Sequence, residues 1–215
     1  MLSRTCRRDI IYALYITCMI LVNTLGSKIT TLLGVRVSVG IFFMPVLFVA
    51  TDVVGEVYGE KEVRTFVNIS LGMLVVLVAM INLCIVLEPN PGWPWQEQYA
   101  LIFGSSTRMT LASIVSFAVS QKLDVRLFAF IRSITGEKHL WLRNNLATIV
   151  CNFVDTMLFD FIAFYRLTPT YTVSFVFSLI IPYWLFKVAF ALLDTPFCYL
   201  GVKWLRGKPA DLPIA

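Results

Sequence analysis

The sequence predicts an all-α, polytopic membrane protein that forms a single domain over residues 1–215. Two observations support this class: 58% of the residues are hydrophobic while 14% are charged, and the mean hydropathy is +0.79. Soluble domains average about 45–50% apolar and about 25% charged residues. Because both values depart in the same direction, the composition argues against a soluble globular domain, a disordered chain and a DNA-binding domain.

Six segments are long and apolar enough to cross a bilayer, which requires about 20 mainly apolar residues. They are residues 10–27, 37–57, 66–88, 107–121, 144–165 and 172–201. Between the third and fourth segments, residues 88–106 contain prolines that should end the preceding helix and tryptophans that suit the membrane interface. No small-residue cleavage site follows the first segment, so we interpret it as a span and not as a signal peptide.

The distribution of basic residues predicts the orientation. With the amino terminus inside, 13 of the 18 lysines and arginines fall in cytoplasmic segments, four fall outside, and Lys187 lies within a span. This bias places both termini in the cytoplasm. Six spans can divide into two halves of three with opposite topology, which is a common plan among transporters. The support for such a 3+3 inverted repeat is limited to acidic residues in both middle spans.

Two opposite charges are predicted at similar depth in the membrane, Asp155 in the fifth span and Lys187 in the sixth. A charge at the centre of a span costs about 2.5–3.5 kcal/mol on insertion scales, so each one requires an explanation. The pair could stabilise the bundle as an ion pair, or it could contact a ligand. The two interpretations are compatible, because an ion pair that a ligand can open would serve as a gate.

Two helical stripes combine polar groups with an aromatic ring. Asn152, Asp155 and Phe159 share one face of the fifth span, at spacings of three and four residues. The corresponding residues of the second span are Phe48, Asp52 and Glu56. For the two aspartates we favour a role in function, because a carboxylate is harder to accommodate in a membrane than an amide.

Several further polar residues and prolines lie within or near the predicted spans. Asn23 and Gln121 suit either ligand binding or ordinary hydrogen bonding between helices, and the second is the commoner use of a single amide. Glu56 and Asp194 are candidates for gating. The sequence Asp194-Thr195-Pro196 is expected to break or bend the last span, because proline lacks a backbone donor.

Motifs for soluble enzymes and for cofactor binding are missing from the sequence. It contains no P-loop, no G-x-S-x-G, no H-E-x-x-H and no dinucleotide-binding motif, and His139 is its single histidine. The five cysteines never form a C-x-x-C pair, so neither a zinc site nor a disulfide framework is predicted. We therefore expect no cofactor and no metal. An intramembrane aspartyl protease using Asp52, Asp155 and Asp194 is a weaker alternative, because no flanking pattern supports a shared proton.

Six motifs in this sequence resemble the vitamin uptake transporter family, the bacterial queuosine precursor transporters. They are N-x-x-x-S-K at 23–28, F-x-x-P-V-L-F-V-A-T-D followed by E-V-Y-G-E-K-x-x-R at 42–64, S-Q-K-L-D-V-R-L-F at 120–128, W-L-R-N-N-L-A-T at 141–148, N-F-V-D-T-M-L-F-D-F-I-A-F at 152–164, and F-K-V-A-F-A-L-L-D-T-P-x-x-Y at 186–199. They occur in the family's order and spacing. Gly55 is a departure, since many members have asparagine there.

The resemblance implies import of 7-cyano-7-deazaguanine, its aminomethyl relative or queuine through a bacterial inner membrane. A carboxylate, Asp52 or Asp155, would bind the guanidine-like edge of such a base, and Phe48 and Phe159 would stack on its ring. The donors for the remaining ring atoms would come from a set of amides and one lysine: Asn23, Gln121, Asn152 and Lys187. If a proton accompanies the base, Asp155 beside Lys187 is the first candidate to carry it.

A different class of function remains open at this point. The chain could be a substrate-capture subunit that depends on a separate ATP-driven module, and uptake by the isolated protein would separate the two. As partners we expect the small-molecule substrate and the lipid bilayer, and no nucleic acid. We also expect a homodimer, since small helical transporters often assemble.

Overall fold

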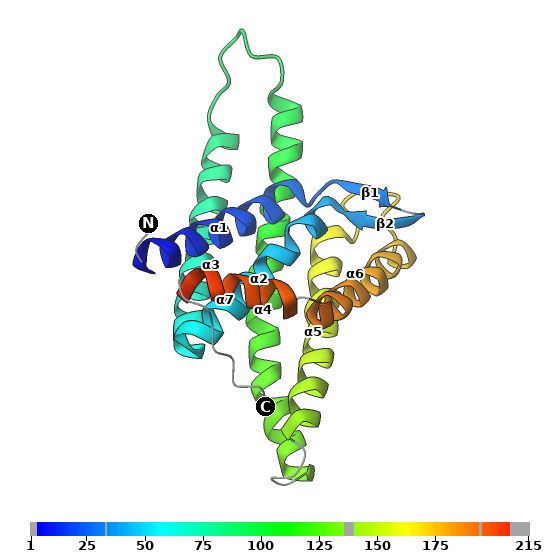
Figure 1. The fold of residues 1–215 in the computed structure, drawn as a ribbon. Coiled ribbons are helices and arrows are strands. Elements are labelled where there is room, and N and C mark those ends of the chain that lie inside the picture. The colour runs from blue at the N-terminus through cyan, green and yellow to red at the C-terminus, as the bar shows by residue number, and fades with distance from the viewer. Residues whose placement is uncertain (1–3, 33, 136–139, 194, 207–215) are drawn as a thin grey trace.

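The computed structural model describes residues 4–32, 34–135, 140–193 and 195–206 and is almost entirely helical. The elements in chain order are α1 (Arg4–Leu25), β1 (Ile29–Leu32), β2 (Val35–Ser38), the 3₁₀ helix η1 (Val39–Phe42), α2 (Met44–Tyr58), α3 (Glu60–Val86), α4 (Gln96–Thr135), α5 (Leu140–Phe164), α6 (Val173–Leu193) and α7 (Thr195–Arg206). In Figure 1, α3, α4 and α5 run along the long dimension of the molecule, and α1, α6 and α7 cross them.

Each of the six predicted spans overlaps at least one helix. Within the described residues, five stretches are long and apolar enough to cross a membrane, namely Thr5–Leu25, Val39–Tyr58, Glu60–Val86, Gln96–Leu123 and Val173–Phe190. The fifth predicted span, 144–165, corresponds to α5. The protein is therefore a multi-pass membrane protein of the all-α class, while the number of spans, the location of the termini and the inverted repeat stay predictions.

The fourth predicted span, 107–121, is too short. Helix α4 begins at Gln96 and continues to Thr135, so the segment predicted as a loop over 88–106 is helical from residue 96 onward. The prolines do end α3, because its last residue is Val86 and the irregular stretch covers only residues 87–95. The error arose because hydropathy reports apolar composition, whereas a helix can extend through polar sequence on either side of the membrane.

The sixth predicted span, 172–201, is wrong as a single helix. Helix α6 ends at Leu193, and α7 is a separate helix that starts at Thr195. Pro196 is the second residue of α7, where a missing backbone N–H breaks no helical hydrogen bond. The predicted break is thus confirmed. Asp194 itself lies outside the described residues.

A two-stranded hairpin, β1 with β2, joins α1 to the second span, and no sequence pattern had predicted it. Its antiparallel register pairs Ile29 with Ser38, so the second predicted span, 37–57, begins inside a strand and is wrong at its start. The Ser38 hydroxyl donates to the Gly26 carbonyl at 2.5 Å and accepts from the Gly40 amide at 3.1 Å. These bonds attach the hairpin to the ends of both α1 and η1.

Two large hydrophobic cores hold the described helices together, and a smaller cluster of Val37, Ile41 and Tyr183 joins the hairpin and η1 to α6. One lies between α1, α2, α3 and α7, and its fully buried side chains include Val54, Phe66 and Leu205. The other lies between α4, α5 and α6, around Met109, Phe164 and Ile180. Many other large apolar side chains are exposed, as expected for surfaces that face lipid.

Helix α7 approaches α2 most closely at Gly201. A Cβ atom added there would lie 2.5 Å from Cγ2 of Val53, which is 2% exposed. Valine has a stiff side chain, so the two helices would have to separate. At Gly72 of α3, by contrast, no atom lies within 4 Å of an added Cβ.

We predict that Gly201→Ala lowers the free energy of unfolding by about 1 kcal/mol, because overpacking outweighs the gain in helix propensity. The matched control Gly72→Ala should leave stability unchanged or raise it by up to about 1 kcal/mol. Thermal unfolding of both variants in detergent measures the difference. Equal melting temperatures would show that the α2–α7 contact is looser than described.

Candidate functional site

An ion pair links α5 to α6. Nζ of Lys187 lies 2.9 Å from Oδ2 of Asp155, and the side chains are 9% and 27% exposed. The predicted pairing of these two charges is therefore confirmed. Each charge offsets much of the other's desolvation, but the partial exposure of Asp155 leaves one side of the pair accessible.

Helix α5 is held in place by an arginine from α4. Nε of Arg108 donates to the Ile162 carbonyl at 2.6 Å, and Nη2 donates to the Tyr165 carbonyl at 2.5 Å. A cation is favourable at the carboxyl end of a helix, where carbonyl groups lack helical partners. This contact sets the position of α5 along α4, and with it the depth of Asp155.

A second polar contact joins α1 to α4. Asn23 is 1% exposed, and its Oδ1 accepts a 2.7 Å hydrogen bond from the Ser113 hydroxyl. The amide nitrogen donates to the Met19 carbonyl at 2.8 Å. Asn23 thus has protein partners for both of its polar atoms, which fits the interpretation of hydrogen bonding between helices. The sequence had given no reason to single out Ser113.

A fully buried carboxylate was missed as a site residue. Asp160 of α5 is 0% exposed, and neither of its oxygens has a hydrogen-bond partner among the residues that the structure describes. It shares a buried stripe of α5 with Thr156 and Ala163. The predicted stripe through Asn152, Asp155 and Phe159 did not include Asp160. The available signal was the spacing of four residues between Thr156 and Asp160, which puts two polar side chains on one face of the helix.

The remaining predicted polar residues lie in different surroundings. Asp52, on α2, is exposed and takes part in an interaction of its own. Glu56 is also exposed and lies 3.6 Å from the Arg206 guanidinium of α7. Gln121 is exposed on α4. The structure brings Asp155 into direct contact with Lys187, and it gives Glu56 a surface ion pair.

The predicted aromatic residues lie on, or pack against, the helices that carry the ion pair. Phe48 of α2 lies with its ring centroid 6.0 Å from that of Phe190, which follows Lys187 by three residues on α6. Phe159 packs edge-on against Phe164 at 6.3 Å. Asn152 is partly buried, and its backbone carbonyl accepts a hydrogen bond from Thr156. These rings and the amide share helices with the ion pair or contact its helix.

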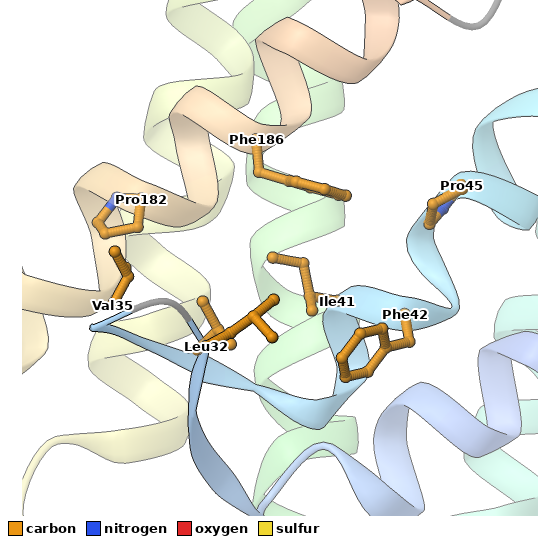
Figure 2. A pocket seen from close by; sticks show the side chains of 8 residues that line it. Leu32, Val35, Ile41, Phe42, Pro45, Pro182 and Phe186 are labelled. Carbon is orange, nitrogen blue, oxygen red and sulfur yellow. The ribbon is translucent and has the colours of Figure 1, made fainter.

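An apolar pocket of about 380 Å³ opens between the hairpin, the start of α2 and α6. Figure 2 shows Val35 and Leu32 of the hairpin facing Pro182 and Phe186 of α6, with Phe42 and Pro45 on the right of the view. None of the lining side chains carries a hydrogen-bonding group. The pocket by itself therefore offers no side-chain hydrogen bond to a polar ligand. Phe186, which lines it, directly precedes Lys187 in α6.

No cluster of three or more potential metal ligands occurs in the described part of the chain. The chemistry available at the site is therefore that of an ion pair, amides, hydroxyls and aromatic rings. Such a set suits reversible binding of a polar, planar molecule.

Comparison with known proteins identifies the family. Residues 38–201 match the family described as "Putative vitamin uptake transporter". The chain belongs to the vitamin uptake transporter family. The matched region contains Asp155, Asp160 and Lys187, and it ends within α7.

Two curated proteins are similar to this chain. A "Probable queuosine precursor transporter" of Bacillus subtilis (strain 168) is 32% identical over 179 residues, which is 83% of this chain and 77% of that protein. A "Queuosine precursor transporter" of Escherichia coli (strain K12) is 28% identical over 146 residues, or 67% of this chain and 62% of that protein. No solved structure matches the chain. The family and these relatives are named as transporters and not as enzymes.

We predict that Lys187→Met lowers the free energy of unfolding by about 2–4 kcal/mol, because it leaves the Asp155 carboxylate unpaired inside the bundle. Combining it with Asp155→Leu should restore most of this loss, since an apolar pair of similar size can replace a buried ion pair. Thermal unfolding in detergent measures both variants.

The control is the exposed pair of Arg64 with Glu60, whose side chains are 71% and 77% exposed. Arg64→Met should change stability by no more than about 0.5 kcal/mol. Equal losses of stability for Arg64→Met and Lys187→Met would show that the buried Lys187 pair contributes no more to stability than an exposed pair.

Proposed function

We propose that this protein imports queuosine precursors, such as 7-cyano-7-deazaguanine, across a bacterial cytoplasmic membrane. The observation that carries the proposal is the ion pair of Lys187 with Asp155, which lies inside the region matched to the family. The names of the two relatives supply the cargo class. Lipid and a small molecule are then the partners, and the base would serve tRNA modification after import.

The ion pair is complementary to one edge of a deazaguanine. That edge presents the O6 acceptor, the N1–H donor and the 2-amino donor in a row. A carboxylate can accept from N1–H and the amino group together, and an ammonium can donate to O6. Asp155 and Lys187 offer these groups 2.9 Å apart. In this proposal the base replaces the direct bond between them, so neither charge is left without a partner.

Aromatic faces beside the pair would hold the flat ring. Phe48 and Phe190 meet between α2 and α6, and Phe159 lies one turn beyond Asp155 on α5. Stacking on aromatic side chains would add affinity for any flat base, whereas the hydrogen bonds would determine which base is bound. Asp52 and Asn152 remain candidates for contacts made in other conformations of the cycle.

Transport would follow alternating access around this site. Pro182 lies within α6, where it removes one helical hydrogen bond, and the helix stops before α7. Broken or bent helices beside a central site are a recurrent feature of transporters. Opening of the ion pair by the base would release α5 from α6 on one side of the membrane. In this proposal both termini lie in the cytoplasm and the protein assembles as a homodimer.

We predict saturable uptake of radiolabelled 7-cyano-7-deazaguanine by the purified protein in liposomes. Asp155→Asn should weaken apparent affinity about tenfold or more, because an amide cannot accept both hydrogen bonds. The control Asp9→Asn, at an aspartate whose side chain is 60% exposed on α1, should transport normally. Binding without uptake would instead indicate a capture subunit that needs a separate energising module.

Competition by other bases tests the recognition edge. Adenine presents an acceptor at N1 and an amino group in place of O6, so it would leave both charges of the pair mismatched. Adenine in about a hundredfold excess should therefore leave uptake unchanged, whereas guanine should compete. Equal competition by the two bases would show that the edge is not read by the ion pair.

A further inference from the structure

Asp160 is the one described carboxylate that is wholly enclosed and yet has no hydrogen-bond donor to either oxygen. Its neighbours on the same stripe of α5 do not supply one. The Thr156 hydroxyl, one turn away, donates to the Asn152 carbonyl at 2.8 Å, and Ala163 has no polar side chain. An ionised carboxylate without donors is strongly disfavoured inside a membrane protein. In this conformation the side chain is therefore suited to the neutral acid.

The groups that surround Asp160 leave it without a counter-ion. Helices α4 and α6 pack most extensively against α5. On α6 the ionisable residues are Tyr183 and Lys187, and both interact electrostatically with Asp160. The Tyr183 hydroxyl donates to the Ser38 carbonyl at 3.4 Å, and the Lys187 ammonium is bound to Asp155.

On α4, the ionisable side chains between residues 103 and 123 are those of Arg108 and Lys122. Arg108 is bound to carbonyls near the end of α5, and Lys122 is exposed. On α5 itself, Asp155 repels a charge at Asp160. One lysine thus acts electrostatically on two carboxylates and is hydrogen-bonded to the more exposed one, Asp155.

We propose that Asp160 carries the proton that couples transport to the pH gradient. The proposal rests on the proposed function and concerns its energy source. When the base takes up Asp155, one hydrogen of the Lys187 ammonium bonds to O6 of the base and the others become available to Asp160. Once the loaded site has opened to the inside, the O–H bond of the Asp160 acid breaks, its electron pair stays on the carboxylate beside Lys187, and the proton passes to water on the inner side. After the base has left and the empty site has opened to the outside again, Lys187 returns to Asp155, and Asp160 takes up a proton from the outer side.

This assignment differs from one in which Asp155 carries the proton. Asp155 has a lysine at 2.9 Å and is 27% exposed, so its carboxylate already has a counter-ion in this conformation. Asp160 has neither advantage. The arrangement gives the two carboxylates separate roles, with Asp155 exchanging Lys187 for the base and Asp160 exchanging a proton for Lys187.

The test uses full-length protein in liposomes with an imposed pH gradient and 7-cyano-7-deazaguanine as the probe. Wild type should accumulate the base when the outside is acidic, and should exchange labelled for unlabelled base without a gradient. Asp160→Asn, a neutral isostere, should keep exchange within about twofold of wild type but lose at least tenfold in gradient-driven accumulation. Asp160→Glu should retain coupling with a shifted pH profile, which keeps the test valid if the asparagine variant folds poorly.

The matched control is Thr156→Val, one turn away on the same buried stripe, which should preserve both accumulation and exchange. A pH-sensitive dye in weakly buffered solution should report proton movement on addition of base for wild type and Thr156→Val, but not for Asp160→Asn. Gradient-driven accumulation by Asp160→Asn equal to that of wild type would overturn the proposal. Wild-type uptake that does not respond to the gradient would overturn the role of Asp160 but leave the proposed function intact. Absence of any uptake or exchange would overturn the proposed function as well.

Discussion

The cost of placing charge inside a membrane protein governs the arrangement of α4, α5 and α6. Lys187 is almost fully buried and must have a partner, and Asp155 supplies it across the α5–α6 contact. The carboxylate in turn requires α5 to sit at one depth, which the bonds of Arg108 to the carbonyls of Ile162 and Tyr165 provide. A register shift of either helix would leave a charge unpaired, and this penalty exceeds what a single apolar contact could offset.

The apolar packing of the described helices forms three clusters. One lies between α4 and the two helices that carry the ion pair, α5 and α6, and another lies between α1, α2, α3 and α7. A third cluster, in which Tyr183 of α6 packs with Val37 and Ile41, and the contacts of α4 with α1 and α3 join these two sets of helices. The bond of Ser113 to Asn23 adds a polar link between α4 and α1.

Lys187 and Asp155 show what sequence patterns can predict. Opposite charges in two apolar segments have few ways to be satisfied, so their pairing followed from cost alone and was confirmed. Asp160 shows the limit. Its position five residues after Asp155 placed it on another face of α5, and whether that face meets lipid, water or protein depends on helices far away in the sequence. Asn23 similarly had two open interpretations until Ser113, 90 residues away, was found beside it.

The sequence by itself determined the membrane class, the positions of the apolar helices, the break before Pro196 and the family motifs, because hydropathy and proline act locally along the chain. Only the tertiary structure decided that α4 extends from Gln96 to Thr135, that residues 29–38 form a hairpin, and that α7 folds against α2. It also decided which carboxylate has a counter-ion. The reason is that the neighbouring charge, hydrogen-bond donor or close-packed methyl group comes from a distant part of the chain. Local sequence does not show which distant residues come close to one another.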